Sequence, residues 1–273
     1  MQETRMSRRN PSAKPRKPKK QKRRVKIWPF FVIPFLLLIV AMGVFGFLTY
    51  RNIASAADTV YTPITVEQMR ETPVALSANQ PVSIMLLQME GESLLSADIA
   101  TINPRMNTTI MKEIPLTAHA EIIGHDGKAP IIQAHQYGGV ELLINTVQNF
   151  LNIPIDYFVE ISGDGVNDLL NLIGGLDPNQ SISVMDVALN FADLDLLRSL
   201  PEMLEVAQGD LRTNLSMEEM MLLAMNYRNA TAHLEQFALS PIELYLEGSV
   251  QQIVGDSDLA TAQAILASHL GVR

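Results

Sequence analysis

The stretch QYGGVELLINTVQNFLNIPIDYFVEI, residues 136–161, carries the clearest structural pattern in this chain of 273 residues. Gly138 and Gly139 open a segment, 140–151, in which apolar side chains recur at helical spacing, and Asn152 closes it. Every second residue is then apolar over 155–161, which predicts a strand with one apolar face. The stretch therefore predicts a helix followed by a strand.

Comparable patterns on both sides of this stretch predict an α/β fold. Ser216 and Glu219 have the spacing of a capping box, which marks the start of a helix. The sequence predicts strands at 82–87, 97–102, 107–114, 181–184, 233–239 and 242–246, and helices at 164–175, 216–228 and 257–270. Since strands and helices alternate, we expect a single domain over 82–273, with a central mixed sheet flanked by helices.

The N-terminus differs from the rest of the chain. Residues 1–26 contain twelve Lys or Arg and a single acid, Glu3, which predicts a disordered basic tail. Residues 27–50, IWPFFVIPFLLLIVAMGVFGFLTY, have no charged side chain. A helix of this length would span about 36 Å, enough to cross a bilayer.

The sequence therefore predicts a single-pass protein of the cell membrane. The basic tail would lie in the cytoplasm, and everything after Arg51 would be extracytoplasmic, beginning with a stalk at 51–81. A cleaved signal peptide is the alternative, because AlaSerAlaAla at 54–57 follows the apolar run.

The composition limits the possible chemistry. Of 21 Lys and Arg and 29 Asp and Glu, nine and 28 remain after Lys26, which gives the exported part a formal charge of −19. The basic tail next to a membrane span is explained by orientation and by attraction to anionic lipid, so we expect no nucleic-acid partner. The chain has no Cys and its five His lack zinc-binding spacing, so we expect no disulfide and no resident metal or other cofactor.

Several motifs together resemble the LytR-CpsA-Psr family. They are TINP at 101–104, EIP at 113–115, the stretch 136–161, and DLLNLIGGLD at 168–177. The resemblance implies one membrane span and an extracytoplasmic α/β domain. It also implies transfer of teichoic acid or another glycopolymer from polyprenyl pyrophosphate to peptidoglycan. In such a reaction Arg side chains hold the pyrophosphate, and carboxylates hold Mg²⁺ or activate a sugar hydroxyl.

The chain departs from the family pattern where that chemistry is expected. The family's Gly-x-Asp-x-Arg is replaced at 88–92 by QMEGE, its Arg before TINP is missing from 92–98, and its Ile-Pro-Arg-Asp reads IPLT at 114–117. Glu90 and Asp98 remain as candidate catalytic carboxylates. Arg105 and Lys112 are candidate substrate-binding cations.

These departures predict a degenerate family member that acts as a binding or accessory protein in envelope assembly or its regulation. Its expected partners are membrane lipid, a polyprenyl-pyrophosphate-linked glycan or peptidoglycan, and an active family paralogue. The alternative is an active transferase with a rebuilt, Mg²⁺-dependent site. A cleft that gathers Glu90 with at least three of six cations would favour the enzyme; these cations are Arg105, Lys112, Lys128, Arg198, Arg212 and Arg228.

Overall fold

The computed structural model describes residues 59–64, 70, 72–163, 165, 209–227, 229–234, 239–246 and 248–272. The predicted tail (1–26), membrane span (27–50) and strand at 181–184 lie outside these residues, as does nearly all of the helix predicted at 164–175. Within the part that is described, no helix is both long and apolar enough to cross a bilayer.

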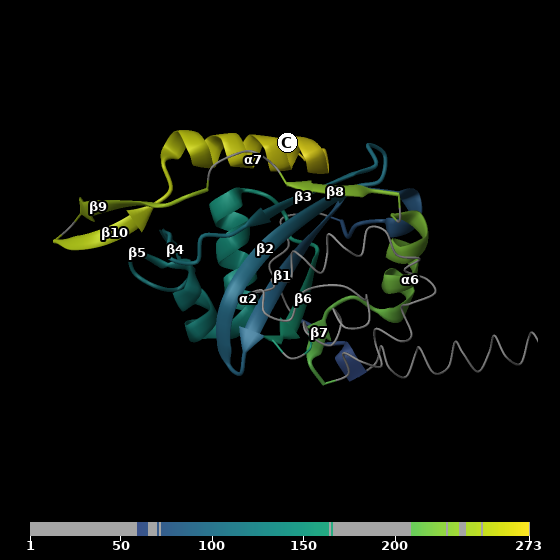
Figure 1. Cartoon of the computed structure of the whole chain (residues 1–273), viewed down its shortest axis with the longest axis horizontal. Coiled ribbons are helices and arrows are strands. Elements are labelled where there is room, and N and C mark those ends of the chain that lie inside the picture. Colours follow the sequence, from purple (N-terminus) through teal and green to yellow (C-terminus); the bar gives the residue numbers. More distant parts are fainter. Residues whose placement is uncertain are drawn as a thin grey trace, which may run out of the picture. The chain divides into compact units, whose positions relative to one another are not determined.

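The described residues form an α/β domain. Its elements in chain order are β1 (Val82–Glu90), β2 (Ser93–Asn103), β3 (Thr108–Glu113), β4 (His119–Glu121), β5 (Lys128–Pro130), α2 (Ile131–Leu151), β6 (Tyr157–Ser162), β7 (Leu211–Thr213), α6 (Met217–Asn226), β8 (Thr231–Leu234), β9 (Ile242–Leu246), β10 (Ser249–Ile253) and α7 (Asp256–Leu270). Figure 1 shows their arrangement.

The central sheet has the strand order β7-β6-β1-β2-β3-β8. β1 pairs parallel with β6, and β3 pairs parallel with β8, whereas the β1–β2, β2–β3 and β6–β7 pairs are antiparallel. The sheet is therefore mixed, as predicted. β4 and β5 form one separate hairpin, and β9 and β10 form another.

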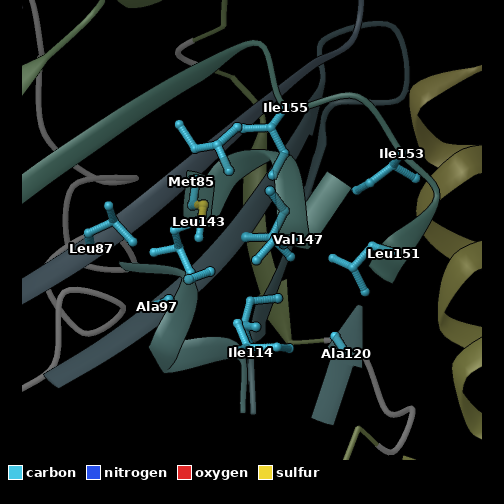
Figure 2. Packing of buried hydrophobic residues seen from close by; sticks show 14 of the residues in the cluster. Met85, Leu87, Ala97, Ile114, Ala120, Leu143, Val147, Leu151, Ile153 and Ile155 are labelled. Carbon is cyan, nitrogen blue, oxygen red and sulfur yellow. The ribbon is translucent and has the colours of Figure 1, made fainter. Parts of the chain in front are cut away.

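Both faces of the sheet are buried. Met85 and Leu87 of β1 pack in a cluster with residues of α2 and α7, and Figure 2 shows them beside Leu143 and Val147 of α2. Ile84, which directly precedes Met85, packs in a second cluster to which α6 contributes. Since neighbouring residues of a strand point to opposite faces, helices cover the sheet on both sides.

The helix in the opening stretch begins earlier than the sequence predicted. α2 starts at Ile131, which is fully buried, and passes through a kink at Gly138 and Gly139. Gly139 has φ 64° and ψ −154°, a backbone conformation that side chains strongly disfavour. The glycines therefore interrupt a helix and do not open one. The predicted end is confirmed, because Asn152 caps α2 in the left-handed conformation.

The strand in the same stretch is buried on both faces, so the prediction of one apolar face was wrong. Tyr157 packs with the cluster that includes α6, and its neighbour Phe158 packs with the cluster that includes α2. Glu160, on the predicted polar face, is only 9% exposed. The reason is topological: β6 lies between β1 and β7, with packed side chains on both sides.

Residues before Val82, assigned to the predicted stalk, also contribute to the packed domain. Val60 is fully buried and Leu76 is 3% exposed, and both lie in the cluster that includes α6. Arg70 forms an ion pair with Asp156 at 2.7 Å. The packed part of the domain therefore begins upstream of Val82.

The C-terminal elements largely follow the sequence. The capping box is present, because Ser216 accepts from the Glu219 backbone N–H while the Glu219 side chain accepts from the Ser216 N–H. β9 and α7 lie where they were predicted, to within one residue. β8 occupies 231–234 instead of 233–239, and residues 235–238 are outside the described part. β10 was not predicted.

Candidate functional site

The two parallel strands β1 and β6 end side by side, at Glu90 and Ser162. In open α/β sheets, ligands bind outside the carboxyl ends of parallel strands. We call this region the carboxyl edge and define it as residues 90–93, 160–163 and 210–212. The start of β7 belongs to this edge because Arg212 is paired in register with Glu160.

The turn between β1 and β2 gives the carboxyl edge an acidic rim. Glu90 pairs with Ser93, so Gly91 and Glu92 alone make the connection. Gly91 has φ 60°, which the tight turn requires. Glu90 and Glu92 are both exposed. Two carboxylates therefore face solvent at this turn.

Behind this rim lies a partly satisfied carboxylate. Arg212 Nη1 donates to Glu160 Oε1 at 2.9 Å, and the Arg212 side chain is 53% exposed. Glu160 Oε2 is buried and has no hydrogen-bond partner among the described residues. Because Glu160 is in register with Leu87, it points to the face that α2 covers. Buried oxygens nearly always have partners, which makes this atom a candidate for binding water or a ligand.

His135, in the part of α2 before the kink, is electrostatically coupled to this pair. Burial lowers the pKa of His135 below its usual value of 6.5, while Glu160 opposes the shift and Arg212 adds to it. The imidazole is therefore neutral at pH 7 and can accept a proton. We call Glu160, Arg212 and His135 the acid–base cluster.

The four candidates from the sequence do not come together. Glu90 lies on the rim, and Asp98 is buried five residues along β2 from Ser93, about 17 Å away at ~3.3 Å per residue. Lys112 is in register with Ile99 and so lies on the face opposite to Asp98. Arg105 lies beyond the other end of β2, more than about 30 Å from Glu90.

The other cations named in the sequence analysis are also distributed over the domain. Lys128 lies opposite Glu121 in the β4–β5 hairpin, and Arg212 belongs to the acid–base cluster. Arg198 and Arg228 are outside the described residues. The described cations therefore do not form the cleft that would favour an enzyme.

A groove of about 620 Å³ lies at the opposite end of the sheet. Arg70 and Arg105 line it together with Asn103, Asn152 and the last residues of α7. The Arg70 guanidinium is already bound to Asp156, so only part of the positive charge in this groove is available to a ligand.

Sequence reasoning missed the acid–base cluster because its members are far apart in sequence. Glu160 was assigned to a solvent-facing side of β6, and Arg212 and His135 belonged to no motif. One signal was available: a parallel strand between other strands is buried on both faces, so an acid within it requires a partner. For metals, the described residues contain no group of three or more His, Asp and Glu side chains that could hold an ion.

Comparison with known proteins was consistent with this fold. The sequence profile described as the LytR_cpsA_psr family matches residues 49–186. Two similar curated proteins are named polyisoprenyl-teichoic acid–peptidoglycan teichoic acid transferase TagU. The protein from Bacillus mycoides is 24% identical, over 80% of this chain and 88% of the relative. The protein from Enterococcus faecalis is 23% identical, over 91% and 98%.

Solved structures share the fold at a similar level of sequence identity. One is described as the LytR-CPS2A-psr family protein YwtF (TagT) with bound octaprenyl pyrophosphate lipid. It is 22% identical to this chain, with a TM-score of 0.58, and the match covers 77% of this chain and 100% of that one.

Proposed function

Because this chain belongs to the LytR-CpsA-Psr family, we propose that it acts in the attachment of glycopolymers in the bacterial cell envelope. Its similarity to proteins named teichoic acid transferases, over most of their length, supports this role. We further propose that residues 27–50 anchor it in the cell membrane, with the tail 1–26 in the cytoplasm and the domain outside.

Within this role, the protein is an accessory member that binds carrier lipid or an active paralogue and transfers glycan poorly. The main support for this accessory role is the charge at the carboxyl edge. Glu90 and Glu92 are exposed there, and the Arg212 guanidinium is already bound to Glu160. A pyrophosphate at this edge would meet repulsion, and each missing charge-assisted hydrogen bond would cost about 1.5–3 kcal/mol.

The second candidate is an active transferase, and it is favoured by Glu160 Oε2, for which residues 59–163 and 209–272, as far as they are described, offer no hydrogen-bond partner. A carboxylate oxygen without a partner can accept the proton of an attacking sugar hydroxyl, or bind Mg²⁺ together with phosphate oxygens. The neutral His135 imidazole is a further proton acceptor. In this reading the rebuilt site is the acid–base cluster, and not a set made of Glu90, Asp98, Arg105 and Lys112.

The test uses the full chain in detergent with a polyprenyl-pyrophosphate-linked glycan and Mg²⁺. Binding is measured by titration, and glycan release and transfer to peptidoglycan are measured on the same sample. Saturable binding without turnover supports the accessory role. Turnover that is lost in Glu160→Gln, but kept in the exposed control Glu121→Gln, supports the transferase.

Two further outcomes would change the proposal. Turnover that depends on Glu90 and not on Glu160, shown with Glu90→Ala, would place the chemistry on the rim. Absence of both binding and turnover would contradict a carrier-binding role and favour a protein partner.

A further inference from the structure

The β9–β10 hairpin projects from the domain on a firm base. Leu239 before β9 and Val254 after β10 are each 3% exposed and belong to the main core cluster. His119 Nδ1 lies 3.1 Å from the Gln252 carbonyl oxygen and 3.2 Å from its backbone nitrogen, which ties β10 to β4. Figure 1 shows the hairpin extending away from the sheet and α2. Its distal part is therefore held in a fixed direction.

That distal part exposes apolar side chains on both of its faces. Tyr245 and Val250 are paired across the two strands and are 73% and 61% exposed. Ile242 and Leu244 are 53% and 43% exposed, and they lie on the other face, because their sequence positions alternate with Tyr245. Exposed apolar side chains that gather in one place mark contacts with proteins or membranes, whereas single ones are common.

We propose that the β9–β10 hairpin docks on the membrane by entering the headgroup layer of the bilayer. A protein partner lying against one face would leave the apolar pair on the other face in water. Lipid surrounds an inserted hairpin and covers both faces at once. Tyr245 suits this place, since tyrosine combines an apolar ring with a hydroxyl that stays hydrated.

The tether supports a membrane as the partner. This step rests on the proposed anchor at 27–50. Residues 51–58 join that anchor to Thr59, where the described domain begins, and eight residues reach at most about 28 Å. The tether thus raises the effective concentration of the hairpin at the bilayer surface, so weak apolar contacts are sufficient for docking.

The structure of the hairpin limits how deeply it can enter the bilayer and which lipids it prefers. It is a two-stranded sheet in the described part of the chain, so its outer backbone groups need water and cannot enter the hydrocarbon core. Glu243 is exposed on it, so attraction to anionic lipid does not drive the contact. We expect shallow docking that is insensitive to salt.

The absence of Cys allows a single fluorescent label to report the contact. The full chain carrying Ser249→Cys is labelled with bimane and reconstituted in phosphatidylcholine vesicles that contain lipids with a nitroxide near the headgroup. We expect quenching several-fold stronger than for a label at Met106→Cys. Met106 is 60% exposed in the β2–β3 turn and serves as the control position. Equal quenching at both positions would overturn the proposal.

Two variants then test the apolar side chains. Tyr245→Ser with Val250→Ser should abolish most of the quenching at residue 249, whereas Met225→Ser, an exposed apolar residue of α6, should leave it unchanged. Unquenched label in a chain that forms dimers broken by Tyr245→Ser would instead make the hairpin a contact between copies. A chain that does not sediment with vesicles contradicts the anchor, while an anchored chain with an unquenched label contradicts only the docking.

Discussion

The two carboxylates near the ends of β6 differ in how completely they are hydrogen-bonded. Asp156, just before the strand, accepts from Arg70 Nε at 2.7 Å, from Arg70 Nη2 at 3.2 Å and from the Ser83 backbone N–H at 2.9 Å. Glu160, within the strand, has one oxygen bound to Arg212, and the other has no partner in the part of the chain that the structure describes. A fully bonded carboxylate fastens the fold, whereas a partly bonded one is available for binding or proton transfer.

A second network strengthens the end that holds Asp156. His269, near the end of α7, is 4% exposed and bonds through Nδ1 to the Thr101 hydroxyl at 2.9 Å and through Nε2 to the Thr108 hydroxyl at 2.8 Å. Asn103 Nδ2 donates to the His269 carbonyl oxygen at 2.7 Å. This end therefore joins α7 and two strands through polar groups that are hydrogen-bonded. Its side chains serve mainly to stabilise the fold, whereas those at the carboxyl edge can take part in function.

Removal of the Asp156 carboxylate should have the largest effect. Asp156→Ala leaves the largely buried Arg70 charge and the Ser83 N–H without their partner, so we expect a loss of about 3–5 kcal/mol in the free energy of unfolding. Urea unfolding of the full chain in detergent, followed by circular dichroism, measures it. Asp126→Ala, in an exposed turn, is the matched control. A loss similar to that of the control would refute a structural role for this end.

The kink in α2 provides the next test. Apart from its own stretch of backbone, no atom of the described residues lies within 4 Å of the place that a Cβ on Gly139 would take, so the expected cost of Gly139→Ala is that of the backbone conformation. We expect a loss of about 1–3 kcal/mol in the free energy of unfolding. Gly163→Ala should cost less, because its φ is not in the left-handed range and its nearest contact is at 3.7 Å. Equal costs would mean that the kink stores no strain next to His135.

The sequence predicted what depends on neighbouring residues. The helix after Gly139, the cap at Asn152, the capping box at Ser216 and the end of α7 at Gly271 all follow from local chemistry. The mixed sheet followed from the alternation of elements. The family resemblance is confirmed by the profile match, which also begins before Val82, as the packing of Val60 does.

The features that the sequence did not predict depend on distant residues. Arg70 and Asp156 are 86 positions apart, and Thr101 and His269 are 168 apart. β6 alternates like a half-exposed strand, and only its place between β1 and β7 reveals that Glu160 is buried. Candidates chosen by their position in motifs, such as Glu90 and Arg105, lie near opposite ends of β2. The extended strand between them separates residues that are close in sequence.

The Glu160–Arg212 pair sharpens the comparison further. Arg212→Ala removes the ion-pair partner of the buried Glu160 carboxylate. We expect a loss of about 1–2 kcal/mol in the free energy of unfolding, because the Arg212 side chain is half exposed and water can take its place beside the carboxylate. Adding Glu160→Gln removes the charge and should recover most of that loss. A double-mutant cycle by urea unfolding gives the coupling. Additive losses would mean that the pair does not interact in solution.

The smallest expected effect is the pH dependence that His135 contributes. Its folded pKa lies below 6.5, the unfolded value, so the unfolded chain binds the proton more tightly. Stability should therefore be unaffected above that pH and should fall as the pH decreases through 6.5 toward the folded pKa. His135→Gln removes this titration, so the wild type should lose stability relative to the variant over that interval. Parallel stability profiles would show that burial does not hold the imidazole neutral. A wild type that gained stability would mean that Glu160 outweighs burial, and then the carboxyl edge would contain a charged pair in place of a proton acceptor.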